Sequence, residues 1–280
     1  MRFILGIVLY YPDLDILDKI KGYSEVFNKI IAFDNSEKNH GIQLEIDKLN
    51  LVNVMYISRN NNYGLSYAYN FLLEKSQDYD YLCILDQDSI FEINDILKMK
   101  QLIETCNLNK PAIIAPIIDY GYKKILRDNI IEKCRYVISS GSFINIKSFK
   151  DNDIRFDENY FIDRVDVDIC QQCLRNGLKI YKYHNSVLHQ KLGDEIKFRH
   201  SSHNKLRHYY IMRNRLYYNY KYNNKNKALV LSLLQTLKQV FLIVLFENDK
   251  LNKLKMLKTA INDFFNNNMG KKEINTSECR

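Results

Sequence analysis

The sequence predicts an α/β fold built on a mostly parallel sheet whose strands are joined by crossover helices. Over much of the chain, apolar runs of strand length alternate with stretches of helical spacing. Hydrophobic residues make up 46% of the 280 residues, which is enough for a sizeable core. Gly (9) and Pro (3) are scarce, so we expect long regular elements and few disordered linkers.

The expected elements follow one another along the chain in strand and helix order. The apolar runs predicted to be strands are 3–9, 29–36, 51–58, 81–85, 112–118 and 178–183. The segments predicted to be helices are 14–27, 64–75, 93–106 and 165–175, with Gly177 as the C-terminal cap of the last. Residues 135–149 alternate in polarity and contain Ser139-Ser140-Gly141-Ser142, which predicts a close-approach turn between strands. From about residue 200 the pattern is helical to the end.

The N-terminal run MRFILGIVLYYPD predicts a first buried strand rather than a signal peptide. Its apolar stretch is short, and no small-residue cleavage site follows it. We therefore expect the chain to stay in the reducing cytoplasm with free thiols. Cys83 lies in an apolar strand, where packing explains it. Cys170 and Cys173 form a C-x-x-C pair, but no second pair follows at zinc-site spacing, so we interpret both as helix residues.

Polar residues follow the first four strands of the predicted sheet. One acidic strand end is ordinary, because Asp often caps the next helix or starts a turn. Ligands of parallel sheets, however, bind outside the carboxyl ends of the strands, so four polar ends on one edge predict a pocket. The residues at these ends are Tyr10, Tyr11, Asp34, Asn35, the run 60–62, Asp86 and Asp88.

A second acidic group precedes and begins the helix expected at 165–175. It comprises Asp163, Asp166 and Asp168. Acids in the first turn of a helix suit its dipole, and this structural reading would suffice for one of them. Three acids in six residues are more than a cap needs, so we also consider them as candidate catalytic groups.

Charge is distributed unevenly along the chain. The net charge is +8, but residues 197–280 hold 17 Lys and Arg against 5 Asp and Glu, whereas residues 1–196 carry −4. We expect a domain at 1–196 and a basic helical region at 197–280. The partner of the basic region is expected to be a phosphate, a nucleic acid or an anionic membrane surface. Within it, 228–246 is strongly apolar but carries a polar stripe of Ser232, Gln235 and Gln239, as in a helix that lies on a surface.

Eight stretches, in this order, resemble the inverting family-2 glycosyltransferases with the GT-A fold. Within that family the chain is most similar to the bacterial rhamnosyltransferase-like branch, and the similarity covers roughly residues 3–270. The stretches are IVLYYP, IAFDNS, NNYGLSYAYN, ILDQDSIF, SSGSFI, the segment 156–177, LHQKLGD and LRHYYIMRN. The resemblance implies a nucleotide-diphospho-sugar transferase sheet with a C-terminal helical extension.

The resemblance also implies how the donor is held. Asp86 and Asp88 match the D-x-D motif, which binds Mg²⁺ or Mn²⁺ together with the donor diphosphate. His189 matches a histidine that completes the metal or diphosphate site, although its spacing to Gly193 is one residue longer than usual and a plain strand-end histidine remains an alternative. The positions that match base, ribose and close backbone contacts are Tyr10, Asp34, Asn62 and Gly64.

For the chemical step, the resemblance implies that Asp166 is the base that deprotonates the acceptor hydroxyl. Many members have Glu-Asp there, whereas this chain has Val165-Asp166, which leaves Asp163 as a rival base and Asp168 as an orienting residue. The stretch containing Arg207, Tyr210, Arg213 and Asn214 matches a basic motif. Its cations are expected to meet a diphosphate of the donor or of a lipid-linked acceptor.

The implied reaction is transfer of a sugar, first choice rhamnose from dTDP-rhamnose, to a glycan acceptor linked to polyprenyl diphosphate in surface-polysaccharide synthesis. Galactosyl, galactofuranosyl or glucosyl transfer from a UDP donor is the alternative. The enzyme is then expected at the inner face of the cytoplasmic membrane, on anionic lipid. A nucleic-acid-binding protein, a sugar nucleotidyltransferase and a binding-only relative remain rivals, although we find no nucleic-acid motif. The oligomeric state is not predicted.

Overall fold

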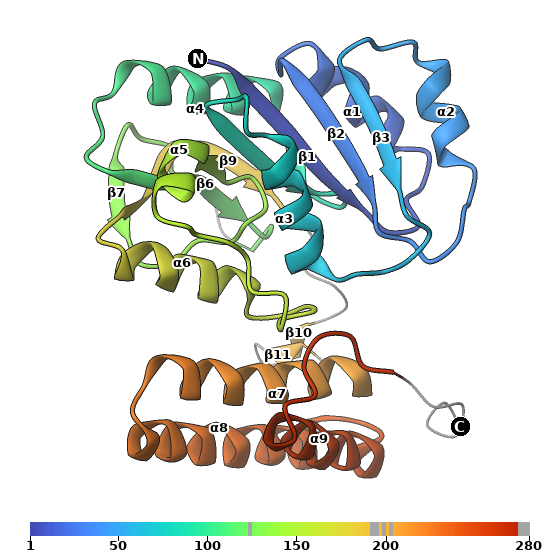
Figure 1. Ribbon diagram of the computed structural model, residues 1–280, viewed down its shortest axis with the longest axis vertical. Coiled ribbons are helices and arrows are strands. Elements are labelled where there is room, and N and C mark those ends of the chain that lie inside the picture. Colours follow the sequence, from blue (N-terminus) through green and yellow to red (C-terminus); the bar gives the residue numbers. More distant parts are fainter. Residues whose placement is uncertain (123–124, 191–195, 198–199, 202–203, 274–280) are drawn as a thin grey trace. The chain divides into compact units, whose positions relative to one another are not determined.

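The computed structural model describes residues 1–122, 125–190, 196–197, 200–201 and 204–273, and the chain forms two compact units (Figure 1). Unit 1 comprises Met1–Asp157 and Asp166–Leu192, and unit 2 comprises Glu158–Val165 and Gly193–Arg280. The chain therefore leaves unit 1, contributes the loop 158–165 to unit 2, and returns. The expected boundary after residue 196 lies close to the second passage, and the excursion at 158–165 was not foreseen.

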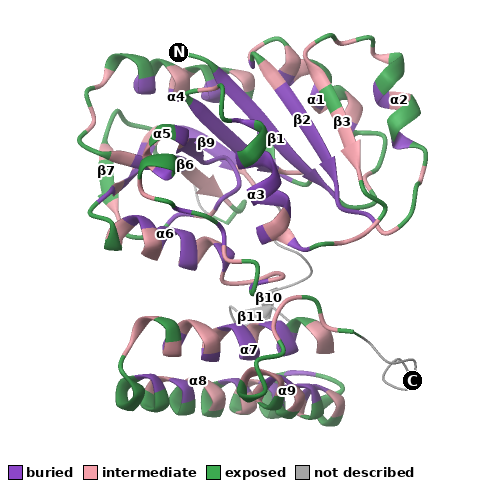
Figure 2. Cartoon of the chain, in the orientation of Figure 1, coloured by how far each residue is buried: buried purple, intermediate pink, exposed green. Residues whose placement is uncertain are grey.

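The first half of unit 1 is a parallel sheet. Its strand order is β3-β2-β1-β4, which is the pattern of strands joined by helical crossovers. Strands β1, β2 and β4 are almost wholly buried, as Figure 2 shows for β1 and β2, whereas β3 is partly exposed. Their bounds are β1 (Phe3–Leu9), β2 (Lys29–Asp34), β3 (Val54–Ser58) and β4 (Tyr81–Asp86).

The second half of unit 1 makes the sheet mixed. The short strand β8 runs antiparallel to both β4 and β6, and the sheet continues in the order β4-β8-β6-β9-β5. β6 and β9 are parallel to each other, whereas β5 and β7 pair with β9 in the antiparallel direction. The bounds are β5 (Ile90–Phe91), β6 (Pro111–Asp119), β7 (Ile131–Cys134), β8 (Phe143–Asn145) and β9 (Lys179–His189).

Helices cover both faces of this sheet. The odd-numbered residues of β1 pack with apolar side chains of α1, α2 and α4. The opposite face meets α3, and there Gly6 allows close approach, because a Cβ at that position would lie 2.6 Å from Cδ1 of Leu72. The helices of unit 1 are α1 (Ile16–Ser24), α2 (Ile42–Lys48), α3 (Leu65–Lys75), α4 (Ile93–Thr105), α5 (Ile146–Asp151) and α6 (Val165–Arg175).

The α/β prediction with a C-terminal helical extension is confirmed, with local differences. The segment 135–149 does not form a long strand pair, because Asn145 caps α5 by accepting a hydrogen bond from the Ser148 N–H (2.8 Å). β9 continues six residues beyond the expected end at residue 183. Before the helices of unit 2, β10 (Ile196–Lys197) and β11 (His200–Ser201) form a small hairpin.

Unit 2 is built on three helices, α7 (Lys205–Tyr222), α8 (Lys225–Phe246) and α9 (Lys250–Phe265), with its own apolar core. Asn204 and Asn224 cap the first two helices by accepting hydrogen bonds from backbone N–H groups three residues on. The core also contains a buried polar chain, in which Glu247 accepts from Lys253 (2.6 Å) and pairs with the His208 ring (2.8 Å). In α8, Gln239 is buried and donates to the His208 carbonyl (3.3 Å), so the polar side of α8 faces the interior of unit 2.

Candidate active site

The carboxyl edge of β1, β2 and β4 brings the predicted strand-end residues together in unit 1. In the parallel register Leu9 lies beside Asp34 and Val8 lies beside Asp86, so the residues that follow these strands emerge along one edge. The amide of Gln87 joins two of these ends, accepting from the Tyr10 N–H (2.7 Å) and donating to the Tyr10 carbonyl (3.0 Å). The predicted strand-end residues therefore lie together along one edge of the sheet.

Asp86 and Asp88 occupy the end of β4 and the turn that follows it. Asp86 accepts a hydrogen bond from the Tyr69 hydroxyl (3.1 Å), and Asp88 is exposed. Burial, together with the neighbouring charges of Asp166 and Asp88, raises the pKa of Asp86 to about 7. A cation bound beside Asp86 would offset this excess of negative charge.

The donor set fits a divalent cation that shares its coordination with phosphate. Among the described residues, no group of three or more His, Cys, Asp and Glu side chains is arranged to hold a metal ion by itself. Mg²⁺, however, usually takes one or two protein carboxylates and completes its coordination with substrate phosphates and water. Asp86 and Asp88 supply such a pair of carboxylates at the pocket edge.

The turn 139–142 connects the acidic strand end to the acidic helix. Ser139 donates to Oδ1 of Asp166 from its backbone N–H (3.0 Å) and from its hydroxyl (2.5 Å). Ser140 Oγ accepts from the N–H of Asp86 (3.0 Å). Gly141 adopts φ +75°, which lets its N–H reach the Ile84 carbonyl (2.7 Å). The sequence predicted a close-approach turn here but not its role in placing both acids.

Asp168 lies two residues beyond Asp166 on the buried side of α6. It is 1% exposed and accepts a hydrogen bond from Nε2 of Gln172 (2.7 Å) within the same helix. This placement suits an orienting residue of the helix rather than a group that meets substrate.

Asp34 ends β2 inside a hydrogen-bonding shell that the sequence analysis missed. Its carboxylate accepts from the Ser36 N–H (2.9 Å) and the Tyr56 hydroxyl (2.6 Å), and pairs with the His40 ring (2.7 Å). Burial and the adjacent Asp34 raise the pKa of Tyr56 well above its usual range. Tyr56 lies in β3 and His40 in a loop, so only the pairing of β2 with β3 reveals them.

The loop 60–64 is ordered against the end of β2. Asn62 Oδ1 accepts from the Gly64 N–H (3.0 Å) and from Nδ2 of Asn35 (3.1 Å). Gly64 adopts φ +85° at the start of α3. Tyr63, 38% exposed, stacks on Tyr67 with ring centroids 4.6 Å apart. Asn62 and Gly64, two positions implied for donor contact, are thus joined by a direct hydrogen bond.

His189 is the last residue of β9 and lies in the same sheet as the D-x-D strand end. It pairs in register with Ile90, two residues after Asp88. Its ring Nδ1 lies 3.1 Å from Oδ2 of Asp119, and the side chain is 43% exposed. The adjoining Gly193 and Asp194 lie outside the described residues.

Comparison with known proteins assigns the family. The family model described as "Glycosyl transferase family 2" matches residues 15–162, more than half of the chain. The chain belongs to glycosyl transferase family 2. The matched region contains Asp34, Asn62, the Asp86–Asp88 pair and the turn 139–142.

Solved structures agree on the GT-A-like fold of this glycosyltransferase. The 1–349 fragment of S. aureus TarS in complex with UDP-GlcNAc gives a TM-score of 0.59 at 13% identity, covering 94% of this chain and 80% of that chain. Another structure of that fragment gives 0.54 at 12% identity, with 95% and 72% covered. GalNAc-T7 with UDP, GalNAc and Mn²⁺ gives 0.58 at 12%, with 69% and 44% covered. No curated protein sequence matches the chain.

Two arginines that the resemblance assigned to a diphosphate lie in unit 2 of the glycosyltransferase and differ sharply. Arg207 is 49% exposed, and its guanidinium lies 3.3 Å from Oδ1 of Asp163. Arg213 is 1% exposed and donates to the carbonyls of Asn268 (3.1 Å) and Gly270 (2.6 Å). These contacts favour a structural role for Arg213, which ties the segment after α9 to α7.

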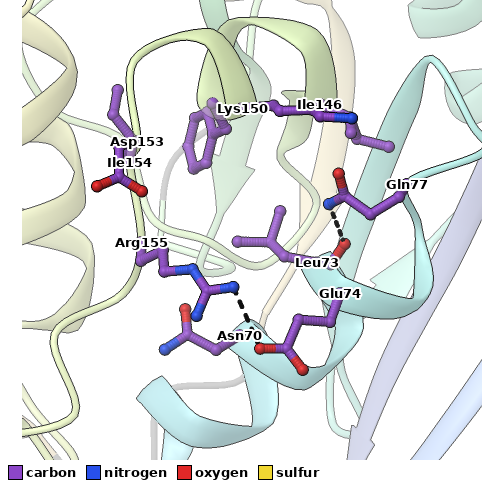
Figure 3. A pocket seen from close by; sticks show the side chains of 10 residues that line it. Asn70, Leu73, Glu74, Gln77, Ile146, Lys150, Asp153, Ile154 and Arg155 are labelled. Carbon is purple, nitrogen blue, oxygen red and sulfur yellow. Dashed lines mark hydrogen bonds and ion pairs between the residues drawn. The ribbon is translucent and has the colours of Figure 1, made fainter.

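Unit 1 of the glycosyltransferase also contains a hollow (Figure 3). It is formed by the latter half of α3, α5 and the segment 153–155, and an ion pair between Glu74 and Arg155 (3.3 Å) lies in it. None of the predicted donor, metal or base residues lines this hollow. The functional assignment therefore rests on the strand-end cluster.

Proposed function

We propose that this family-2 glycosyltransferase moves a hexosyl group from a nucleotide-diphosphate donor to a glycan acceptor with inversion and with help from a divalent metal ion. The observation that carries the proposal is the convergence of Asp86, Asp88 and Asp166 in unit 1. Burial, together with the charges of Asp166 and Asp88, raises the pKa of Asp86, and the turn 139–142 contacts both Asp86 and Asp166. Like charges gathered at a sheet edge suited to ligands favour a functional site.

Asp86 and Asp88 would hold Mg²⁺ or Mn²⁺ at the strand end. A bound ion of this kind neutralises the charge that develops on the departing diphosphate. The protein's own contribution is to fix Asp86, whose carboxylate accepts from the Tyr69 hydroxyl and whose backbone N–H donates to Ser140. His189 would join Asp86 and Asp88, because its half-exposed ring at the end of β9 is compatible with that role.

Asp166 would take the proton of the acceptor hydroxyl as its oxygen attacks the anomeric carbon from the face opposite the leaving diphosphate. One displacement with one base inverts the sugar. The two bonds from Ser139 fix one carboxylate oxygen of Asp166. The rival base Asp163 is already engaged by Arg207, whose guanidinium lies 3.3 Å from its Oδ1. Burial nevertheless raises the pKa of Asp163, so the preference for Asp166 rests on its contacts with Ser139.

The donor is proposed to be dTDP-rhamnose first, with UDP-galactose, UDP-galactofuranose and UDP-glucose as the second choice. The Asp34–Asn62–Gly64 edge supports a nucleoside, because a buried acceptor and ordered amides at a strand end suit ribose and base donors. The similar structure of TarS contains UDP-GlcNAc and that of GalNAc-T7 contains UDP. These contents support UDP-sugars as the alternative donors.

A turnover assay with each nucleotide sugar, with Mn²⁺ or EDTA, tests the proposal. We expect release of the nucleoside diphosphate with one donor, abolition by EDTA, and loss of activity in Asp88→Ala with an unchanged circular dichroism spectrum. Full activity of the wild type in EDTA would remove the metal from the mechanism. Absence of turnover with every donor, together with no thermal shift, would overturn the assignment of a sugar-nucleotide site.

The acceptor is proposed to be lipid-linked, because the polar face of α8 is buried and its apolar face is exposed. Ser232 and Gln239 are buried against α7, where they bond Asn219 (3.0 Å) and Arg215 (3.1 Å). The opposite side exposes large apolar residues, although water normally faces polar side chains. The exposed apolar residues of α8 are Leu229, Val230, Leu233, Leu234, Leu237, Phe241, Val244, Leu245 and Phe246.

An anionic lipid surface is the proposed cover for this apolar face. α8 carries three lysines and no acidic residue, and lysines beside an apolar face suit lipid phosphate. By length and composition α8 is apolar enough to cross a membrane, with 17% of its most apolar window buried. Because its polar side is bonded to α7, we favour a helix that lies in the membrane plane at the cytoplasmic face.

A further inference from the structure

Three arginines of unit 2 lie near one partly buried carboxylate. Arg207 pairs with Asp163, and Arg164 and Arg215 are close enough to favour the charged form of the same group. Arg164 is its neighbour in the chain, whereas the other two project from α7 two turns apart. Residues eight apart lie on nearly the same face of a helix, so α7 presents both guanidinium groups to the loop 158–165.

The loop that carries Asp163 is held firmly against α7. Asp163 and Arg164 adopt φ +62° and +69°, a conformation that non-glycine residues rarely hold without support. Asn214, 0% exposed, supplies that support by donating from Nδ2 to the carbonyls of Ile162 (2.6 Å) and Asp163 (3.1 Å). The cluster is therefore built into the fold of unit 2 rather than assembled from free surface side chains.

The neutral neighbours of the cluster orient its cations without neutralising them. Arg215 donates to Oε1 of Gln239 (3.1 Å), and the Arg164 guanidinium lies 5.4 Å from the centre of the Tyr218 ring. Burial lowers the pKa of Arg215, and the like charge of Arg164 lowers it further. Three guanidinium groups and one carboxylate leave two positive charges in excess.

Asp163 itself has unused hydrogen-bonding capacity. Its Oδ1 meets Arg207, whereas its buried Oδ2 has no hydrogen-bond partner among the residues that the structure describes. A buried polar atom of this kind is costly unless a ligand or water completes it. The missing partner of Oδ2 must be a hydrogen-bond donor, either a water molecule or a hydroxyl group elsewhere on the molecule that carries the anion.

We propose that Arg164, Arg207 and Arg215 form an anion site for a phosphate or diphosphate group, with Asp163 as the internal counter-charge that orients them. Planar guanidinium groups match phosphate oxygens with paired, charge-assisted hydrogen bonds. The half-exposed Arg207 gives access from solvent. The assignment rests on the proposed function for its ligand, which is the diphosphate of a lipid-linked acceptor or of the nucleotide donor.

Calorimetric titration of the full chain with inorganic pyrophosphate in EDTA tests the site. Without metal, the carboxylates of unit 1 repel the probe. We expect Arg164→Gln and Arg215→Gln to weaken binding by roughly tenfold or more, the worth of one lost charge-assisted contact. Arg215→Lys should lose less, because it keeps the charge. Asp163→Asn should tighten binding, because it removes the competing carboxylate.

Two controls locate the binding. Lys258→Gln and Lys255→Gln each remove an exposed cation from α9 of the same unit and should leave the affinity unchanged. Circular dichroism verifies that each variant is folded. The proposal is overturned if the wild type does not bind pyrophosphate, if Lys258→Gln weakens binding as much as Arg215→Gln, or if the two glutamine variants bind normally.

Titration with UDP and, separately, farnesyl diphosphate identifies the source of the anion. Weakened farnesyl diphosphate binding in Arg215→Gln with normal UDP binding points to the acceptor, and the opposite pattern points to the donor. If neither is weakened, the site is rejected. Since all these titrations exclude metal and require no turnover, their outcome is separate from the sugar-nucleotide assay that tests the proposed function.

Discussion

Ser139 donates two hydrogen bonds to a single oxygen of Asp166, from its backbone N–H at 3.0 Å and from its hydroxyl at 2.5 Å. The next residue, Ser140, accepts from the backbone of Asp86. One turn therefore fixes the separation between the proposed base and the proposed metal carboxylates. Such fixed spacing matters because catalysis falls steeply when reacting groups are misplaced by as little as about 1 Å.

Replacement of the proposed base is expected to stop chemistry and spare binding. Asp166→Asn keeps the shape of the side chain but cannot take up a proton, so kcat should fall by about 10²–10⁴-fold. Donor affinity, measured by calorimetry, should persist. Asp163→Asn is the comparison variant and should retain far more turnover. A dead Asp163→Asn beside an active Asp166→Asn would transfer the base role to Asp163.

Removal of the Ser139 hydroxyl should affect turnover in a graded way. Ser139→Ala keeps the backbone N–H but loses one bond to the carboxylate, so we expect kcat to fall roughly tenfold with little change in the donor KM. The acid limb of the pH–rate profile should move to higher pH, since that bond favours the charged carboxylate. Ser24→Ala, whose hydroxyl bonds only the Lys21 carbonyl in α1, is the matched control. An unshifted profile would leave Ser139 with a purely structural role.

The raised pKa of Asp86 predicts how stability depends on pH in the metal-free protein. Folding raises this pKa from an ordinary 3.8 to about 7, so the folded state binds more protons between those values. Its contribution to stability is present below about pH 4 and is lost as the pH rises through about 7. In EDTA, Asp86→Asn should therefore raise the Tm at pH 8 and change it little at pH 4. Equal shifts at both pH values would contradict the assignment.

The apolar face of α8 predicts how the protein distributes between water and lipid. The wild type should float with anionic vesicles, and less with neutral vesicles or in high salt, because salt screens the charge attraction. The triple variant Leu233→Ser, Leu237→Ser and Phe241→Ser should lose flotation. Val52→Ser, which changes a 99% exposed residue of unit 1, should not. A wild type that stays at the bottom with every lipid would remove the membrane from the proposal.

The sequence located the edge of the sheet well because strand ends are local signals. Apolar runs that stop at Asp34 and Asp86 are legible in one dimension, and parallel pairing then places both ends together. The polar stripe on 228–246 was also readable, and Ser232 and Gln239 do lie on the packed side of α8. The helix period alone specifies which side chains share a face.

Partners that come from distant segments were not predictable. The Ser139–Asp166 contact joins residues 27 apart, and neither residue type requires the other. Arg213 and Arg215 are two positions apart on α7, and only the packing of the segment after α9 decides that Arg213 is buried. Arg215 was therefore passed over for Arg213. Tyr56 and His40 were missed because their common partner, Asp34, is buried.

The excursion of residues 158–165 into unit 2 also orders events during synthesis. Asn214, which bonds the carbonyls of Ile162 and Asp163, leaves the ribosome 52 and 51 residues after its two partners. A nascent chain that has completed every strand of the sheet still lacks the helix on which this loop rests. The segment just before Asp166 thus matures after the sheet, so a premature stop before α7 would leave an assembled sheet whose loop has not acquired its final conformation.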